Sequence, residues 1–427
     1  MSQFFSKLLK QMQPEGPDDP ASEQDARDWF AVRVQSILAT VGVAAEYDVE
    51  QFALRIGGGG CVSWLGNRFD EYRGAPAEDR EDILLHVARG IVEASHASPL
   101  APRVEDARPH LRPRIRQRAQ LVILGLQMEA DGLDPDDVLH AFVPVSDDLG
   151  AEVVYDTPTH IVSIPGDRLA AWGLPPDEAL RVAVDNLRAS TPRPFVHRGD
   201  GVWMADAGDS YDSARLLLTD EIAALPLDGE PVALPANRDT LVVTGADNIG
   251  GLYRVLEEAM RAIDRPRINT LQPVVLRQGR WQDWLPAASH PMREAFGELA
   301  MLTRGTSYAV LKDLLVARHE RDGVDLFVAS YGMFRQKDGR TPFSHAIWPR
   351  VRGLLPEADL VSVFHPDDPR YIVVPRPVLL RMAGHLLDPV PELHPPYHAF
   401  DGVPDVRLWN ALREHAVREV VVPPQGP

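Results

Sequence analysis

The residues with the clearest chemical potential are acidic, and they gather in one short stretch. Asp206, Asp209 and Asp212 recur at every third position and are followed by Arg215, with Tyr211 between them. Carboxylates at a turn can bind a hard divalent cation through their oxygens. They can equally cap the helix expected after position 212, because a side-chain oxygen accepts hydrogen bonds from the first N–H groups of a helix.

The spacing favours capping over metal binding. The stretch lacks the glycine and the terminal glutamate that a calcium loop places at fixed offsets. We therefore expect Asp209 or Asp212 to cap the helix, and we expect neither a metal site nor a cofactor. Asn186 and Arg188 lie on the preceding predicted helix, and if they face the acidic turn they form a polar pocket with it.

A row of arginines is the second candidate site. Arg112, Arg114 and Arg116 occupy alternate positions, as does Arg118 after them, so they share one face of an extended strand. That face is either an anion-binding edge or an ordinary solvated face that pairs with acidic residues elsewhere. The very acidic composition favours the second interpretation.

Four consecutive glycines, at positions 57–60, precede Cys61, the one cysteine of the chain. A phosphate-binding loop would lead from its glycines into a helix through Lys and Ser or Thr, and none of these follows. Large apolar residues instead alternate over 52–56 and again over 62–64, which predicts a β-hairpin with the glycines at its turn. No neighbouring base activates Cys61, so we expect it to be dispensable.

The histidines give no catalytic or metal-binding signature. His394 and His398 are four residues apart, but two prolines between them exclude the helix that would bring both to one face. His365 belongs to the stretch "FHPDDPR", whose proline and aspartates are typical of a hairpin turn.

Hydrophobic periodicity indicates a mixed sequence of helices and strands. We predict helices near 30–41, 83–91, 176–189, 212–223, 252–263, 308–319 and 347–355. We predict strands near 52–56, 62–64, 121–126, 152–155, 160–164, 239–245, 268–276, 325–330 and 359–365. The helix and strand order after 286 repeats the order of the preceding region, so a degenerate internal repeat is a further hypothesis.

Composition limits the class of protein. The chain has 427 residues, 44% of them hydrophobic, and a net charge of −18. This length suits more than one domain, the charge repels nucleic-acid phosphates and anionic membranes, and no apolar run is long enough to span a bilayer. A single cysteine suits the reducing cytoplasm, where we expect the protein to reside. Residues 1–24 read as a polar tail with a short amphipathic helix.

Three motifs in the central region resemble a known family. The stretches "ALRVAVDNLRAS" (179–190), "DSYDSARLLL" (209–218) and "RDTLVVTGADN" (238–248) occur in the order seen in the YtpQ-like family of bacterial proteins, a domain of unknown function. The resemblance covers about residues 28–286. The chain departs from the family pattern at Ser210, where glycine is expected, and adds about a third of its length at the C-terminus. The family implies no reaction, cofactor or catalytic residue.

The sequence thus predicts an α+β protein. Residues 25–290 form the YtpQ-like region, with a helix-hairpin-helix unit at 25–97 and a mixed α/β unit at 98–290, and 291–427 form an α/β extension. We expect noncatalytic binding of a protein or a small molecule, without nucleic acid or a membrane span, because no acid, base and nucleophile assemble at recognisable spacing. The alternative is a hydrolase or metal-assisted enzyme that uses the acidic turn from Asp206 to Arg215.

Overall fold

The structure, a computed structural model, shows an α+β protein. It describes residues 23–56, 61–96, 100–132, 142–157, 161–263, 265, 268–336 and 341–421. The chain divides into two compact units. The first is Met1–Ala101 with Asp156–Val162, and the second is Pro102–Tyr155 with Ser163–Pro427. Within the described part of the chain, no helix is both long and apolar enough to cross a membrane.

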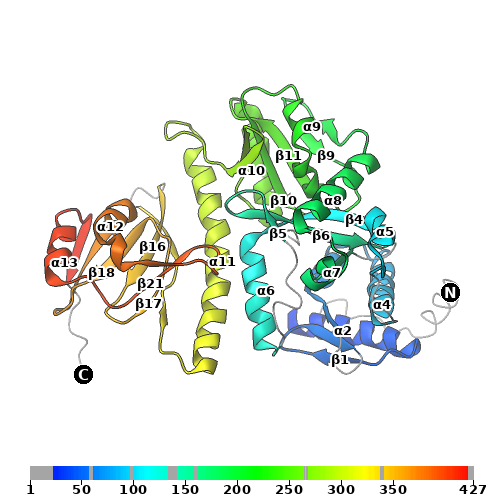
Figure 1. Ribbon diagram of the computed structural model, residues 1–427, viewed down its shortest axis with the longest axis horizontal. Helices are drawn as coiled ribbons and strands as arrows, with labels where there is room; N and C mark the ends of the chain where they lie inside the picture. The colour runs from blue at the N-terminus through cyan, green and yellow to red at the C-terminus, as the bar shows by residue number, and fades with distance from the viewer. Residues whose placement is uncertain are drawn as a thin grey trace. The chain divides into compact units, whose positions relative to one another are not determined.

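The first unit packs helices on a small antiparallel sheet (Figure 1, blue). Its elements are α2 (Glu23–Thr40), β1 (Ala45–Asp48), β2 (Ala53–Ile56), β3 (Cys61–Trp64), α3 (Gly66–Gly74) and α4 (Arg80–His96). The pair Ile56 and Cys61 joins β2 to β3, which agrees with the predicted hairpin, whereas residues 57–60 lie outside the described residues. Strand β1 and helix α3 were not predicted.

The core of the first unit follows from the helical period of α2. Phe30, Val34, Ile37 and Leu38 recur on one face of the helix, and all four are buried. Phe30 meets the ring of Phe69 from α3 edge to face, at 5.5 Å between centroids. This apolar face therefore ties α2 to the rest of the unit.

The second unit begins with a small sheet of order β4-β6-β5. Its elements are α5 (Val104–Ala107), the 3-10 helix η1 (Arg108–His110), β4 (Leu111–Gln117), α6 (Arg118–Ala130), β5 (Phe142–Pro144), β6 (Leu149–Asp156), α7 (Gly166–Ala171) and α8 (Pro176–Ser190), and the chain passes from the first unit back to the second within β7 (Ile161–Ser163). Helix α8 packs on β4, and its bounds agree with the helix predicted there.

A larger antiparallel sheet of order β13-β12-β10-β11-β9-β8 follows. Its region contains β8 (Phe195–His197), β9 (Trp203–Ala205), the 3-10 helix η3 (Ser213–Leu217), α9 (Thr219–Ala223), β10 (Pro231–Asn237), β11 (Thr240–Gly245), α10 (Ile249–Ile263), β12 (Val274–Arg277) and β13 (Arg280–Asp283). Strand β11 is buried along its whole length, because α10 covers one face of the sheet and η3 lies against the other.

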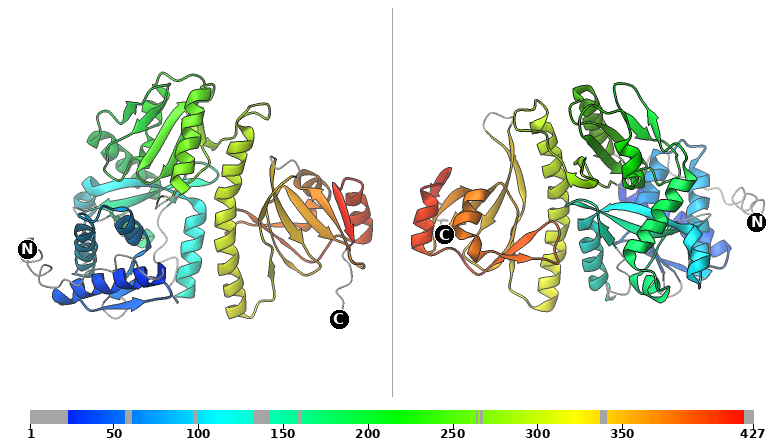
Figure 2. Two further views of the ribbon diagram at one scale, coloured as in Figure 1. Left: turned by 180° about the vertical axis from the view of Figure 1, so that it is seen from behind. Right: turned by 45° about the horizontal axis from the view of Figure 1, so that its top comes forward.

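The last part of the second unit is built around the long helix α11 (Figures 1 and 2, yellow). Its elements are α11 (Arg293–Asp322), β14 (Phe327–Val328), β15 (Gly332–Arg335), β16 (Pro342–Trp348), β17 (Gly353–Pro356), β18 (Leu360–Phe364), β19 (Arg370–Pro375), α12 (Arg376–Ala383), the 3-10 helix η4 (Gly384–Leu386), β20 (Asp388–Val390), β21 (Tyr397–Phe400), α13 (Val406–Arg413) and β22 (Arg418–Val421). The strands form two sheets, β14-β17-β21-β20 and β15-β16-β18-β19-β22. Helix α11 packs against α6 and also against β14, β15 and β16, so it joins the C-terminal sheets to the preceding region.

Three predicted elements are wrong. The α-helix predicted at 212–223 is the 3-10 helix η3 followed by the short helix α9. The strand predicted at 121–126 lies within helix α6, and the helix predicted at 347–355 is the end of β16 and the start of β17. The error at 347–355 removes the helix on which the repeat hypothesis depended. The two C-terminal sheets also differ in strand order from the larger antiparallel sheet, so the internal repeat is not observed.

Candidate functional site

The acidic turn is organised by Arg215, whose side chain is completely buried. Its guanidinium donates to both carboxylate oxygens of Asp209, at 2.9 and 2.7 Å, and to Asp212 at 3.2 Å. A further N–H reaches the hydroxyl of Thr191 at 2.5 Å, just after α8. A buried cation is thus matched by two carboxylates, an arrangement that holds the turn together.

The predicted helix cap is wrong. Asp212 accepts hydrogen bonds from the backbone N–H groups of Ala207 and Gly208, which precede it, and no side chain caps η3. Asp209 accepts from the N–H of Tyr211, two residues on, in an Asx-type turn. The following element is also a short 3-10 helix and not the predicted α-helix. Because its dipole is small, it contributes little electrostatic stabilisation to these carboxylates.

Burial and Arg215 set the protonation of the two aspartates. Burial raises the pKa of Asp212, despite hydrogen bonds from backbone N–H groups and the charge of Arg215. Burial also acts to raise the pKa of Asp209, but the bidentate hydrogen bonds and charge of Arg215 outweigh it and lower the pKa. Both carboxyl groups therefore accept hydrogen bonds from the guanidinium of Arg215.

The remaining candidates of this group lie apart from the Arg215 cluster. Asp206 pairs with Arg198, Arg188 pairs with Glu221 and Asp185, and the side-chain amide of Asn186 donates to carbonyl groups near the start of β4. Tyr211 is buried within the turn. The polar pocket predicted from α8 and the acidic turn is therefore not formed.

The arginine row pairs with an acidic residue, as the favoured interpretation predicts. Arg114 and Arg116 both contact Glu152 on β6, the second at 2.6 Å, and the Glu152 side chain is fully buried. Arg112 donates instead to the backbone carbonyl groups of Pro109 and Leu111. Burial lowers the pKa of Arg116, and the charge of Arg114 adds to this effect. Arg114 and Arg116 thus link β4 to β6, and Arg112 bonds within its own segment, so the row does not form an open anion-binding edge.

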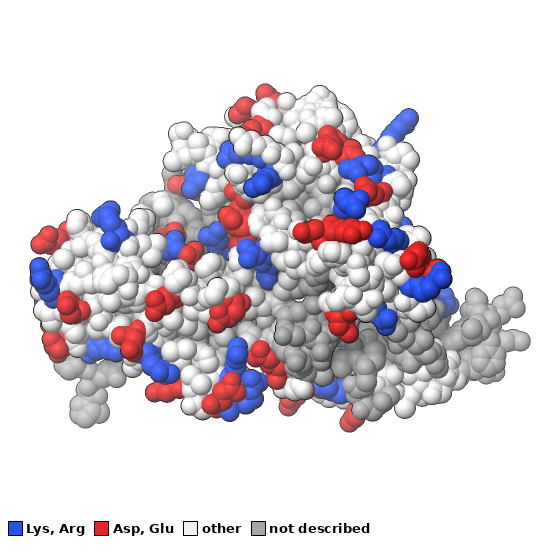
Figure 3. Space-filling view, in the orientation of Figure 1, with Lys and Arg blue, Asp and Glu red and all other residues white. Residues whose placement is uncertain are grey.

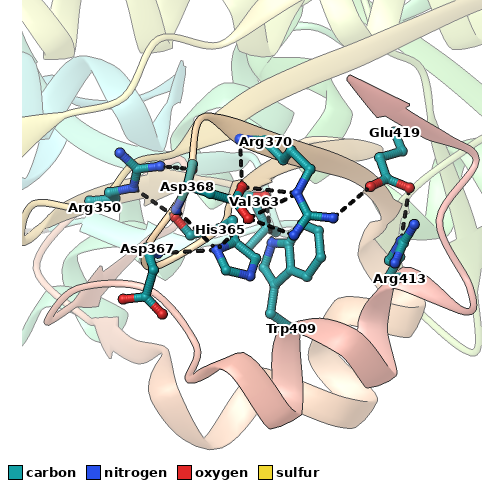
Figure 4. A network of polar contacts seen from close by, with 9 residues as sticks. All are labelled: Arg350, Val363, His365, Asp367, Asp368, Arg370, Trp409, Arg413 and Glu419. Atoms are coloured by element: carbon teal, nitrogen blue, oxygen red, sulfur yellow. Dashed lines mark hydrogen bonds and ion pairs between the residues drawn. The ribbon is translucent and has the colours of Figure 1, made fainter. Parts of the chain in front are cut away.

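The "FHPDDPR" stretch forms the predicted hairpin turn, between β18 and β19 (Figure 4). His365 Nδ1 accepts the N–H groups of Asp367 and Asp368, at 3.1 and 3.2 Å. Arg370 bonds the carboxylate of Asp368 and lies over the ring of Trp409. Hydrogen bonds from Arg370 lower the pKa of Asp368 to about 2. The histidine and the aspartates thus close the turn.

A buried carboxyl pair, Asp148 and Asp283, was missed in the sequence. Ser146 donates to Asp283 at 2.5 Å, and Asp148 contacts His394 Nε2 at 3.0 Å and Arg304 Nε at 3.5 Å. Burial, followed by the charge of Asp148, raises the pKa of Asp283 to about 7. Burial also acts on Asp148, but its hydrogen bond with His394 and the charge of Arg304 lower its pKa.

The geometry of this carboxyl pair leaves two buried oxygens without a hydrogen bond. They are Oδ2 of Asp148, which has Arg304 Nε at 3.5 Å, and Oδ2 of Asp283, and the raised pKa of Asp283 favours a proton on that carboxyl. A protonated Asp283 donates to Asp148 and satisfies both oxygens. The adjoining cavity measures about 10 Å³, which is room for a single water and not for a substrate.

A larger pocket lies on the other side of Arg304, and we call it the α11 pocket. Its volume is about 360 Å³. One face of α11, the start of β16, the segment before β18 and the start of α12 form its walls. Its lining residues are Leu285, Arg293, Glu294, Gly297, Ala300, Met301, Arg304, Tyr331, Thr341, Pro342, Phe343, Ser344, Glu357, Ala358, Asp359 and Arg376.

Small residues of α11 create this space. Gly297 and Ala300 lie one turn apart on the pocket-facing side, and a Cβ added to Gly297 would meet no atom within 4 Å. Arg304, one further turn along, lines both this pocket and the small cavity beside Asp148. Arg304 thus contacts the buried carboxyl pair through Asp148 and also lines the α11 pocket.

Neither a metal centre nor a known relative identifies the site. Among the residues that the structure describes, no group of three or more His, Cys, Asp or Glu side chains is placed to hold a metal ion. No protein-family model, curated protein or solved structure matches the chain. The resemblance to the YtpQ-like family stays a prediction.

Proposed function

We propose that this protein is a noncatalytic binding module whose small-molecule ligand occupies the α11 pocket. The observation that carries the proposal is the pocket itself, since its volume lies in the range of ligand sites and most of its lining residues belong to helices α11 and α12 and strand β16. The alternative of an enzyme at the acidic turn has no support from the geometry, because Asp209 and Asp212 are bonded to Arg215.

The chemistry of the pocket wall supports binding. Ser344 Oγ donates to Asp359 at 2.7 Å and accepts from the N–H of Asp359 at 2.8 Å, so the hydroxyl is held in a closed pair. The lining residues include no histidine or cysteine. A nucleophile with a base and a third, orienting group is therefore not assembled among these residues.

We also propose a cytoplasmic location and membership of the YtpQ-like family. A cytoplasmic location fits the single cysteine, and membership of the YtpQ-like family fits the order of the three motifs quoted above. A protein partner is compatible with the same binding role, but the pocket is a specific observation that favours a small molecule.

The test fills the pocket without damaging the fold. Gly297→Leu adds a side chain where a Cβ meets open space, and replacing a helix-interior glycine stabilises by roughly 0.5–1 kcal/mol. Gly90→Leu is the matched control, since Gly90 lies inside α4 and a Cβ there also meets no atom within 4 Å. Wild type and both variants are dialysed against a small-molecule extract, and the retained compounds are measured by mass spectrometry.

We expect wild type and Gly90→Leu to retain a compound that Gly297→Leu does not retain, although both variants melt at or above the wild-type temperature. Identical retention by all three proteins would show that the pocket is not a ligand site. Turnover of the retained compound by the wild type would contradict the noncatalytic role.

A further inference from the structure

Two of the three carboxylates that line the α11 pocket, those of Glu357 and Asp359, are engaged by the protein itself, whereas the third, Glu294, lies in the first turn of α11 beside Arg293. Glu357 pairs with Arg376 at the start of α12. Asp359 accepts from both the hydroxyl and the backbone N–H of Ser344, at 2.7 and 2.8 Å. These two acids therefore offer little to attract a cationic ligand, because their charge or lone pairs already have internal partners.

Arg304 keeps hydrogen-bond donors beyond its contact with the protein. Within the described part of the chain, its ion pair is with Asp148, through Nε at 3.5 Å, and its side chain is 39% exposed. A guanidinium carries five N–H groups in a planar fork, which matches the geometry of a carboxylate or a phosphate. Asp148 also contacts His394, which fixes the position of the carboxylate that pairs with Arg304.

The lining also includes six apolar side chains. The side chains concerned are those of Leu285, Ala300, Met301, Pro342, Phe343 and Ala358. They suit an apolar or aromatic ligand body, because such contacts gain free energy from removing surface from water.

Arg293 lies at the other end of the same helix face. It is eleven residues before Arg304 and donates to the carbonyl of Pro286 at 2.8 Å. At about 1.5 Å of rise per residue, the two Cα atoms are about 16 Å apart along the helix. The hydrogen bond to Pro286 turns the guanidinium of Arg293 to the backbone and uses one of its donors. The buried support behind Arg304 favours Arg304 as the anchor.

We infer that the α11 pocket binds a small organic anion whose carboxylate or phosphate group contacts Arg304 and whose apolar body packs on Met301 and Phe343. The inference rests on the proposed function and names the ligand class of the same pocket. The free acid and the phosphate ester share this chemistry, and the choice of probes separates them.

The experiment compares three probes that share a phenyl ring: benzoate, phenyl phosphate and neutral benzyl alcohol. Dissociation constants come from ligand-observed NMR with the full-length protein. We expect wild type to bind one of the anions on the order of tenfold more tightly than benzyl alcohol, as a bidentate guanidinium contact allows. The tighter anion shows whether the head group is a carboxylate or a phosphate.

Two arginine variants show which side chain is responsible for the preference for anions over benzyl alcohol. Arg304→Gln should bring the anion to within about twofold of benzyl alcohol, whereas Arg293→Gln, a matched change in the same pocket, should keep the wild-type ratio. If Arg304→Gln fails to fold because Asp148 loses its partner, the double variant Asp148→Asn/Arg304→Gln removes both charges and replaces it.

The possible failures are distinguishable. Equal binding of anions and benzyl alcohol that disappears in Gly297→Leu would overturn the anion inference and leave the proposed function standing. Loss of the anion preference in Arg293→Gln, with Arg304→Gln unaffected, would overturn the assignment to Arg304. Binding of every probe that persists in Gly297→Leu would place the probes outside the pocket and contradict the proposed function itself.

Discussion

At the scale of single residues, Arg215 shows that aspartates that resemble metal ligands in the sequence can instead form ion pairs with an arginine of the same chain. Its side chain is fully buried between Asp209 and Asp212, and Thr191 takes a further N–H. The alternation of acids and one arginine is visible in the sequence, but burial is not. Sequence reasoning assigned the carboxylates to a helix end, because their spacing lacks the pattern of a calcium loop.

Removing Arg215 should therefore be costly. Arg215→Met is expected to destabilise the protein by about 3–5 kcal/mol, because two partly buried carboxylates lose their partner. Arg188→Met, a matched change in an exposed ion pair of the same region, should cost less than about 1 kcal/mol. Chemical unfolding followed by tryptophan fluorescence measures both, and equal costs would refute the structural role of the Arg215 cluster.

Asp283 gives a prediction about pH. Its folded-state pKa of about 7 lies above the ordinary value of 3.8, so the folded protein holds the proton more tightly than the unfolded chain. The resulting stabilisation is complete below about pH 4 and is lost as the pH rises towards 7. Asp283→Asn does not titrate and keeps a donor for Asp148, so its stability relative to wild type should improve from pH 5 to pH 8, on the order of 1–2 kcal/mol.

Melting temperatures at pH 5 and pH 8 test this expectation. Asp147→Asn is the control, since Asp147 is exposed on the turn that contains Asp148 and its charge is the smallest of the causes that shift the pKa of Asp283. A pH trend shared by both variants would mean that the trend does not come from Asp283.

At the scale of elements, β5 packs on β6 only because position 150 is glycine. A Cβ there would lie 1.8 Å from the ring of Phe142, far inside van der Waals contact. Gly150→Ala should cost about 1–3 kcal/mol, as overpacking does in a close-packed interior. In the double variant Phe142→Ala/Gly150→Ala the clash is absent, so the two costs should not add.

A double-mutant cycle by thermal unfolding measures this coupling. Purely additive costs would show that the ring of Phe142 does not lie over Gly150 in solution.

The elements also show what the sequence can specify. Helix α8 was predictable because its apolar period extends over several turns and acidic residues with a proline mark its start. Helix α6 was mistaken for a strand because "LVILGL" is a short, nearly continuous apolar run, which periodicity alone does not assign. Its helical state is supported by packing against α11, which lies far along the chain.

The α11 pocket and the buried carboxyl pair were unpredictable for a related reason. Asp148, Asp283, Arg304 and His394 are separated by tens to hundreds of residues, and each occurs in an unremarkable local context. They meet only because α11 packs between the region that contains β5, β6 and β13 and the C-terminal sheets. Local patterns predict elements, whereas this site depends on how distant elements pack.

At the scale of the whole molecule, charge is the property that most restricts its partners. The net charge is −18, and on the face in Figure 3 basic side chains are interspersed with acidic ones. Many arginines are paired locally with carboxylates, as Arg277 is with Glu230 and Arg254 is with Glu257. Paired arginines contribute little long-range attraction for a polyanion.

We therefore expect no binding to duplex DNA. In fluorescence anisotropy with a labelled random duplex at about 150 mM salt, micromolar protein should produce no change, because the phosphate attraction that drives non-specific binding is replaced by repulsion. The same assay with a labelled anionic ligand of the α11 pocket should still give a signal, since that contact depends on the short-range fork of Arg304 and not on net charge. Salt-sensitive DNA binding would reveal a basic surface that outweighs the overall charge, and it would make a nucleic acid a candidate partner.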